Sequence, residues 1–172
     1  MAIPVLERYL SEAQVDYRLT PHSVAFTAME IAQRAHVPGD AFAKTVLVKV
    51  DGKLVMLVMP ATRAVDFAGL TQALHCQRLE LAMEYEFESL FAECELGAEP
   101  PLGQLFGLPV YLDAELTRYP RISFNAGTLR EVMEMDSQDF LRLVEPHILH
   151  QGFVPGRQAL LHQHPRSGPL PH

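Results

Sequence analysis

The alternation of apolar and polar positions predicts a chain in which helices and strands follow one another as far as Val144. Apolar residues recur at helical spacing over residues 3–14, 65–75 and 84–91. Short apolar runs that are typical of strands occupy residues 15–19, 110–113, 121–125 and 131–135. Polar N-cap signals start two further helices, at Thr27 with Glu30 three residues later and at Asp136 or Ser137.

A β-hairpin is the strongest single signal in the chain. Residues 45–50 and 54–59 are apolar on both faces, and Asp51-Gly52 between them supplies the positive φ angles of a tight turn. Strands with two apolar faces need cover on both sides. We therefore expect a single compact α/β domain, with a central mixed β-sheet that contains this hairpin and helices packed around it.

The chain changes character near its C-terminal end. Residues 147–172 hold five of the eight histidines together with frequent prolines and glycines. We expect a domain over residues 1–146 and a loosely attached tail over 147–172. Removal of the chain from Gly152 onward should then leave the melting temperature nearly unchanged. The tail histidines lack the regular spacing of metal ligands.

Length and charge narrow the function. A chain of 172 residues fits one domain, and two cysteines (Cys76 and Cys94) give no disulfide framework. With neither a secretion signal nor a membrane-length apolar run, we expect the cytoplasm and no membrane partner. A net charge of −7 disfavours general nucleic-acid binding and a DNA-binding regulator, but leaves room for a local phosphate site. No metal or cofactor is expected, and a homodimer is a possible assembly.

Three segments, in order, carry a family resemblance. They are Ala43-Lys44-Thr45-Val46-Leu47-Val48, the loop Gly97-Ala98-Glu99-Pro100-Pro101-Leu102-Gly103, and the pair Val110–Asp113 and Ile122–Thr128. Together with the preceding His22-Ser23, they resemble the YbaK / prolyl-tRNA synthetase-associated editing-domain family over about residues 4–145. One departure is Leu129, which stands where many members have histidine.

The resemblance implies a free-standing deacylase that removes a wrong, small amino acid from the 3′ end of a tRNA, with tRNA-Pro as one candidate. Such a second sieve is needed because an apolar pocket discriminates one methylene by only ~1–3 kcal/mol. The nucleophile is expected to be water, assisted by the ribose hydroxyl of the substrate. A catalytically silent module that binds aminoacyl or nucleotide ligands is the alternative from another class.

The candidates for catalysis are Lys44, Gly97, Pro101 and Asp113, and each has a plainer alternative. Lys44 would hold a terminal phosphate, or is an ordinary strand end. The loop from Gly97 to Pro101 would aim N–H groups at the oxyanion, or is a structural turn. Asp113 would orient the substrate amino group or a water, or caps the turn at residues 114–116. Cys94 is expected to be a small core residue.

Further residues of the matching segments are expected to bind the substrate. His22 is a secondary candidate for a proton shuttle, although a lone histidine is more often a surface or core residue. The expected binding set is His22, Thr45, Ala98, Glu99, Pro100, Gly103, Asn125 and Gly127.

Overall fold

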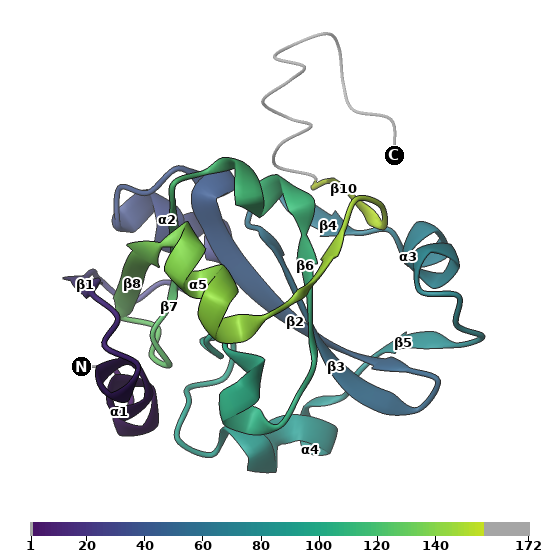
Figure 1. Cartoon of the computed structure of the whole chain (residues 1–172), viewed down its shortest axis with the longest axis horizontal. Helices are drawn as coiled ribbons and strands as arrows, with labels where there is room; N and C mark the ends of the chain where they lie inside the picture. Colours follow the sequence, from purple (N-terminus) through teal and green to yellow (C-terminus); the bar gives the residue numbers. More distant parts are fainter. Residues whose placement is uncertain (1, 157–172) are drawn as a thin grey trace, which may run out of the picture.

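A mixed β-sheet of eight strands forms the centre of the protein (Figure 1). The computed structural model describes residues 2–156. The strand order is β1-β8-β7-β2-β3-β6-β9, and β5 also pairs with β2. The bounds are β1 Tyr17–Pro21, β2 Phe42–Val50, β3 Lys53–Pro60, β5 Leu79–Leu81, β6 Val110–Asp113, β7 Arg121–Asn125, β8 Glu131–Asp136 and β9 His147–Leu149.

The helices lie around this sheet, so the expected mixed α/β fold is confirmed (Figure 1). The α-helices are α1 Pro4–Glu12, α2 Ala28–Arg34, α3 Phe67–Ala73, α4 Glu84–Phe87 and α5 Ser137–Val144. Short 3-10 helices span Gly39–Ala41, Glu88–Phe91, Gly103–Phe106 and Ala114–Arg118. No helix within residues 2–156 has the length and apolar character needed to cross a bilayer.

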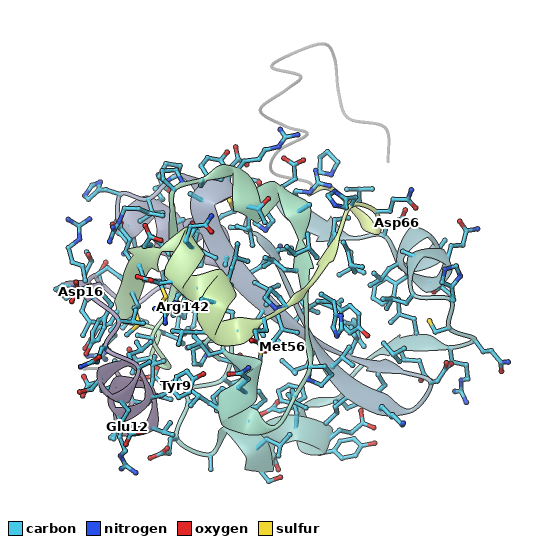
Figure 2. The ribbon with its side chains drawn as sticks, in the orientation of Figure 1. Tyr9, Glu12, Asp16, Met56, Asp66 and Arg142 are labelled. Carbon is cyan, nitrogen blue, oxygen red and sulfur yellow. The ribbon has the colours of Figure 1, made fainter. Side chains whose placement is uncertain are left out.

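The predicted hairpin is confirmed as β2 and β3, in antiparallel register from Ala43↔Pro60 to Val50↔Lys53. Its turn places Asp51 at φ 49° and Gly52 at φ 84°, the positive angles that the Asp-Gly pair predicts. Side chains on both faces of β3 are buried, and Met56 has no exposed surface. Figure 2 shows Met56 in the interior and Glu12 and Asp16 at the periphery.

The sheet forks along β2. The start of β2 pairs in parallel with β7, as Phe42↔Ser123 and Ala43↔Phe124, whereas its end pairs antiparallel with β5 from Val48 to Val50. Alternation along the strand puts Phe42 and Lys44 on one face and Ala43 and Thr45 on the other. The residues just after Ala43 therefore lie where the two neighbours of β2 diverge.

Three apolar clusters fill the interior. The largest packs on the Ala43 face, together with α1 and α5 residues such as Leu6 and Phe140. A second cluster surrounds Leu57 and Leu70 near α3. The third, here called the α2 cluster, packs α2 on the start of β2; its buried members are Ala25, Ile31, Ala32, Ala35, Phe42, Ala61, Ala98, Leu129 and Val132.

The chain after Pro146 contributes to the fold, so the boundary expected there is too early. Strand β9 pairs in parallel with β6, and β10 (Phe153–Pro155) pairs antiparallel with β4 (Arg63–Val65). Phe153 is only 7% exposed and packs in the cluster near α3. Strands of three residues are too short to show a periodicity in the sequence. The rest of the expected tail, residues 157–172, lies outside the described residues.

Candidate active site

Lys44 presents a half-buried ammonium at the edge of the α2 cluster. Its Nζ donates a 3.4 Å hydrogen bond to the carbonyl oxygen of Ala61, a member of that cluster. Within residues 2–156, no carboxylate lies within 4.0 Å of this ammonium, whereas Lys49 on the opposite face pairs with Glu86 at 2.8 Å. Burial lowers the pKa of Lys44. An ammonium without a counter-ion, partly removed from water, is suited to receive an anion.

Asn125 lies beside Lys44 on the same face of the sheet. The parallel pairing of β2 and β7 ends at Ala43↔Phe124, and Lys44 and Asn125 are the next residues of the two strands. Asn125 is 6% exposed, and its Nδ2 donates to the carbonyl oxygen of Gly97 at 3.3 Å. Its Oδ1 is buried and has no hydrogen-bond partner among residues 2–156. A buried acceptor left unpaired costs ~1–3 kcal/mol, which a ligand N–H or O–H group would recover.

The predicted loop and the turn after β7 form one hydrogen-bonded unit. Gly127 N donates to Ala98 O at 3.1 Å, and Glu95 N donates to Gly127 O at 2.9 Å. Leu129 N donates to the carboxylate of Glu95 at 3.1 Å. Because Ala98 and Leu129 both pack in the α2 cluster, this unit forms a fixed wall beside Asn125 and on the Phe42 side of the sheet.

Two N–H groups of the loop already have acceptors within the protein. Gly97 N donates to Glu99 Oε1 at 3.2 Å, and Ala98 N donates to Glu95 O at 3.0 Å. Pro100 and Pro101 have no N–H group. The oxyanion role expected of the loop therefore does not fall to the amides of Gly97 and Ala98, which have local acceptors.

Asp113 behaves as its plainer alternative predicts. One carboxylate oxygen pairs with Arg63 Nε at 2.8 Å, and the other accepts from Glu115 N at 3.1 Å, at the start of the 3-10 helix. Burial raises the pKa of Asp113, against the hydrogen bond from Glu115 N and the charge of Arg63. Both oxygens are engaged, and the ion pair with Arg63 joins the end of β6 to β4. Sequence reasoning missed Arg63, since this ion pair joins residues far apart in the chain.

Two of the expected binding glycines lie in tight packing, and Thr45 lies away from Lys44. A Cβ on Gly103 would lie 2.4 Å from Leu108 O, and one on Gly127 would lie 2.6 Å from Ile3 Cγ2. Both glycines are needed for close packing. Thr45 points to the face opposite Lys44, where its hydroxyl is buried and has no partner among residues 2–156.

Glu99 and His22 are the two expected binding residues with titratable side chains. Glu99 is 7% exposed and, with Cys94, lines a small cavity of about 150 Å³ near α4. Burial raises the pKa of Glu99, and it raises the pKa of Cys94 to about 12, which leaves that thiol unreactive. His22 bonds through Nδ1 to Ser23 O at 2.7 Å, while its buried Nε2 has no partner among residues 2–156.

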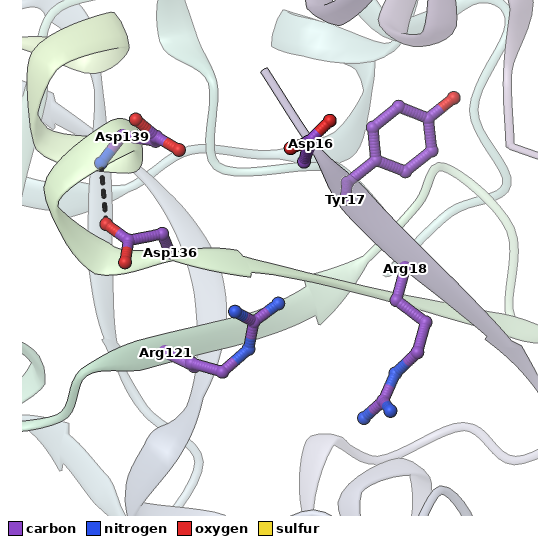
Figure 3. Close-up of a pocket in the computed structure, with 6 residues that line it drawn as sticks. All are labelled: Asp16, Tyr17, Arg18, Arg121, Asp136 and Asp139. Carbon is purple, nitrogen blue, oxygen red and sulfur yellow. Dashed lines mark hydrogen bonds between the residues drawn. The ribbon is translucent and has the colours of Figure 1, made fainter.

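A polar hollow of about 480 Å³ lies at the ends of β1, β7 and β8 (Figure 3). Arg18 and Arg121 line it, and both pair with the single carboxylate of Glu134. Asp136 caps α5 by accepting from the backbone of Asp139, the bond drawn in Figure 3. These side chains are already paired, so this hollow is a structural feature. In the described part of the chain, no group of His, Cys, Asp and Glu side chains could hold a metal ion.

Comparison with known proteins places this geometry in a family. The model of the aminoacyl-tRNA editing domain matches residues 22–143. The multifunctional Ser/Thr-tRNA deacylase ProXp-y of Escherichia coli strain K12 is 26% identical over 82% of this chain and 87% of its own length. A proline–tRNA ligase of Desulfovibrio desulfuricans is 35% identical over 54% of this chain and 16% of the ligase.

Solved structures agree on the fold. The crystal structure of a candidate trans-editing enzyme for prolyl tRNA synthetase superposes with a TM-score of 0.71 and 22% identity, covering 87% of this chain and 97% of that one. The matched region contains α2, the loop at Gly97, and the strands β2 and β7 that carry Lys44 and Asn125. The chain belongs to the aminoacyl-tRNA editing domain family, whose members are hydrolases that act on the ester bond of aminoacyl-tRNA.

Proposed function

We propose that this chain is a trans-editing hydrolase that cleaves the ester between a wrongly attached small amino acid and the 3′ end of a tRNA. One observation carries the proposal. The ammonium of Lys44 has no carboxylate partner among residues 2–156, the Oδ1 of Asn125 has no hydrogen-bond partner in the same range, and the two residues directly follow the last register pair of β2 and β7, on one face of the sheet. The similarity to a proline–tRNA ligase supports tRNA-Pro as the first candidate, and the similarity to a Ser/Thr-tRNA deacylase supports seryl- and threonyl-tRNA as the next ones.

Lys44 holds the phosphate of the terminal nucleotide. A compact ammonium forms a strong charge-assisted hydrogen bond with phosphate oxygen. The hydrogen bond that Lys44 now makes, to the carbonyl oxygen of Ala61, is long at 3.4 Å and has an uncharged acceptor. A phosphate oxygen in its place would form a stronger bond with the ammonium. This contact fixes the terminal adenosine beside Lys44, where β7 and β5, the two neighbours of β2, diverge.

Asn125 holds the amino-acid end. Its Oδ1 accepts a hydrogen bond from the α-ammonium group of the aminoacyl moiety, and Gly97 O keeps the amide in the orientation that presents this oxygen. The side chain of the amino acid packs against the apolar surface at Ala98 and Leu129.

The chemical step is hydrolysis by water. The water oxygen bonds to the ester carbon, the bond from that carbon to the ribose oxygen breaks, and the ribose oxygen takes a proton. The adjacent ribose hydroxyl assists the water, as the family resemblance implies. Since the loop amides already have acceptors, the contribution of the protein is positioning by Lys44 and Asn125.

The occupied loop amides also support the second candidate, a module that binds aminoacyl-tRNA without cleaving it. Release of free amino acid from a panel of mischarged tRNAs distinguishes the two. A hydrolase releases one amino acid faster than the uncatalysed rate at catalytic protein concentration. A binding module protects the ester, which would end the first proposal.

Lys44→Met tests the role of the ammonium. Hydrolysis should fall about 10- to 100-fold, the equivalent of ~1.5–3 kcal/mol for a hydrogen bond to a charged group. The fold should survive, because burial opposes the charged form of Lys44 and methionine needs no water. Kinetics and thermal melting are measured on the same samples, with Lys53→Met, at the start of β3, as the matched control. Full activity in Lys44→Met would overturn the phosphate contact.

A further inference from the structure

Two arginines beside the α2 cluster lack the ion pairs that most others have. Among residues 2–156, six arginines lie within 4.0 Å of a carboxylate: Arg18, Arg63, Arg78, Arg118, Arg121 and Arg142. In the same range, Arg8, Arg34 and Arg130 do not. Arg8 is on α1, whereas Arg34 and Arg130 both approach the segment that leads into α2.

The segment His22–Ser23 joins these two arginines. His22 N donates to the carbonyl oxygen of Arg130 at 2.8 Å, and the guanidinium of Arg34 donates to the hydroxyl of Ser23. Arg130 directly follows Leu129, and Arg34 belongs to the helix that supplies Ile31 to the same cluster. Both arginines are exposed and lie in elements that also contribute buried residues to the α2 cluster; together with the nearby Phe26 they are called the rim here.

An exposed aromatic ring lies on the same rim. Phe26 is 74% exposed, although its neighbour Ala25 is buried in the α2 cluster at 1% exposed. A ring this exposed contributes nothing to the core. A cationic rim with an accessible aromatic ring is the combination that binds single-stranded nucleic acid, through phosphate contacts and base stacking.

The rest of the molecule repels nucleic acid. The chain carries a net charge of −7, so a tRNA needs local cations where it touches the protein. Lys44 provides one such charge for the terminal nucleotide. The nucleotides that precede it are single-stranded in a tRNA, and the α2 cluster borders both Lys44 and the rim.

We propose that Arg34, Arg130 and Phe26 bind the single-stranded nucleotides that precede the terminal adenosine, the arginines through phosphates and the ring by stacking. The inference rests on the proposed function for its ligand. It adds a second binding element that acts on the nucleic acid and not on the aminoacyl group. This element therefore affects the binding of tRNA, while the chemical step at Lys44 and Asn125 is unchanged.

The test uses the full chain, a mischarged tRNA, and a short substrate in which a single adenosine carries the same amino acid. With tRNA, the double variant Arg34→Gln/Arg130→Gln should raise KM at least about tenfold and leave kcat unchanged. Its binding of an uncharged oligoribonucleotide should lose about 1.4 from the slope of log K against log salt, since each single-strand phosphate contact contributes ~0.7. Phe26→Ala should raise KM with no change of slope.

Controls separate charge from structure. Ser23→Ala removes the partner of Arg34 without removing charge, so its salt slope should match the wild type. Arg78→Gln/Arg118→Gln removes two exposed arginines that are paired elsewhere, at Glu80 and Glu115, and should match as well. On the short substrate all variants should equal the wild type.

Two outcomes would overturn the rim proposal alone. The first is an unchanged salt slope and KM in the double variant. The second is an equal loss on the short substrate, which would mean that the arginines act on the pocket. A wild-type protein that hydrolyses neither substrate would instead sink the proposed function, while the oligoribonucleotide slopes would still decide the rim.

Discussion

Glu99 is a buried carboxylate that accepts a hydrogen bond from Gly97 N and so holds the loop at Gly97. Burial raises its pKa above the value in the unfolded chain, so the folded state binds the proton more tightly. The wild type should then lose stability as the pH rises through the window between the unfolded and the raised folded pKa. Below that window, Glu99 is neutral in both states and contributes no pH dependence.

Glu99→Gln tests this sign, because glutamine keeps an acceptor for Gly97 N and never ionises. The difference in melting temperature, variant minus wild type, should be larger at pH 7 than at pH 4. Thermal melts at both values decide it, with the exposed Glu93→Gln as control. A variant that loses stability specifically at pH 7 would mean that the charged carboxylate is the stabilising form.

Leu129 is the residue at which this chain departs from the frequent family histidine, and it is 8% exposed in the α2 cluster. Leu129→Ala should shift the ratio of kcat/KM toward larger amino acids, by roughly tenfold for one methylene. It should also lower stability by about 2–4 kcal/mol, as other buried leucine truncations do. A series of aminoacyl-tRNAs differing by single methylenes measures the ratio. An unchanged ratio would remove Leu129 from the substrate wall.

At the scale of elements, the loop and the turn offer two glycines with the same backbone geometry and different surroundings. Gly97 has φ 88° and Gly127 has φ 93°, so alanine at either costs about 1–2 kcal/mol in the left-handed region. A Cβ at Gly97 meets nothing within 4 Å, whereas at Gly127 it meets Ile3 at 2.6 Å. Gly127→Ala should therefore be less stable than Gly97→Ala by a further ~1–3 kcal/mol. Urea unfolding of the pair measures this difference, and equal values would place the turn away from α1.

Elements with a local signal were predictable from the sequence. The hairpin, the strands at Val110–Asp113 and Arg121–Asn125, and the capped helices at Thr27 and Asp136 have the expected positions. Each depends on neighbouring residues, such as the Asp-Gly pair or an N-cap oxygen.

Elements and contacts made at a distance were not predictable. Strands β4, β5, β9 and β10 have three residues each and exist through their partners in the sheets. In the site, Lys44 and Asn125 were predictable as residues, but their adjacency depends on the parallel pairing of β2 with β7. The engagement of the loop amides by Glu95 and Glu99 also has no signal in the chain order.

At the scale of the molecule, the C-terminal strands change the expectation for truncation. A chain that ends at Pro146 loses β9, β10 and the buried Phe153, and Arg63 loses its acceptor at Phe153 O. Loss of one large buried side chain costs ~3–5 kcal/mol, so the melting temperature should fall by roughly 6–20 °C. A chain that ends at Gly156 should melt within about 3 °C of the full chain. Thermal melts of the two chains compare them directly. Equal melting temperatures would show that β9 and β10 contribute nothing to the stability of the fold.

The strand order also sets a schedule for synthesis on the ribosome. Among residues 2–156, strand β1 pairs only with β8, as Tyr17↔Met135, so the first strand made waits roughly 110 residues for its partner. At about 5–20 residues per second, this wait lasts roughly 6–20 s. The hairpin of β2 and β3 can close early, while β1 remains an open edge that other chains could join. A slowly translated messenger therefore lengthens the period in which this small domain is exposed to aggregation, and a chaperone that shields the N-terminal segment would protect it.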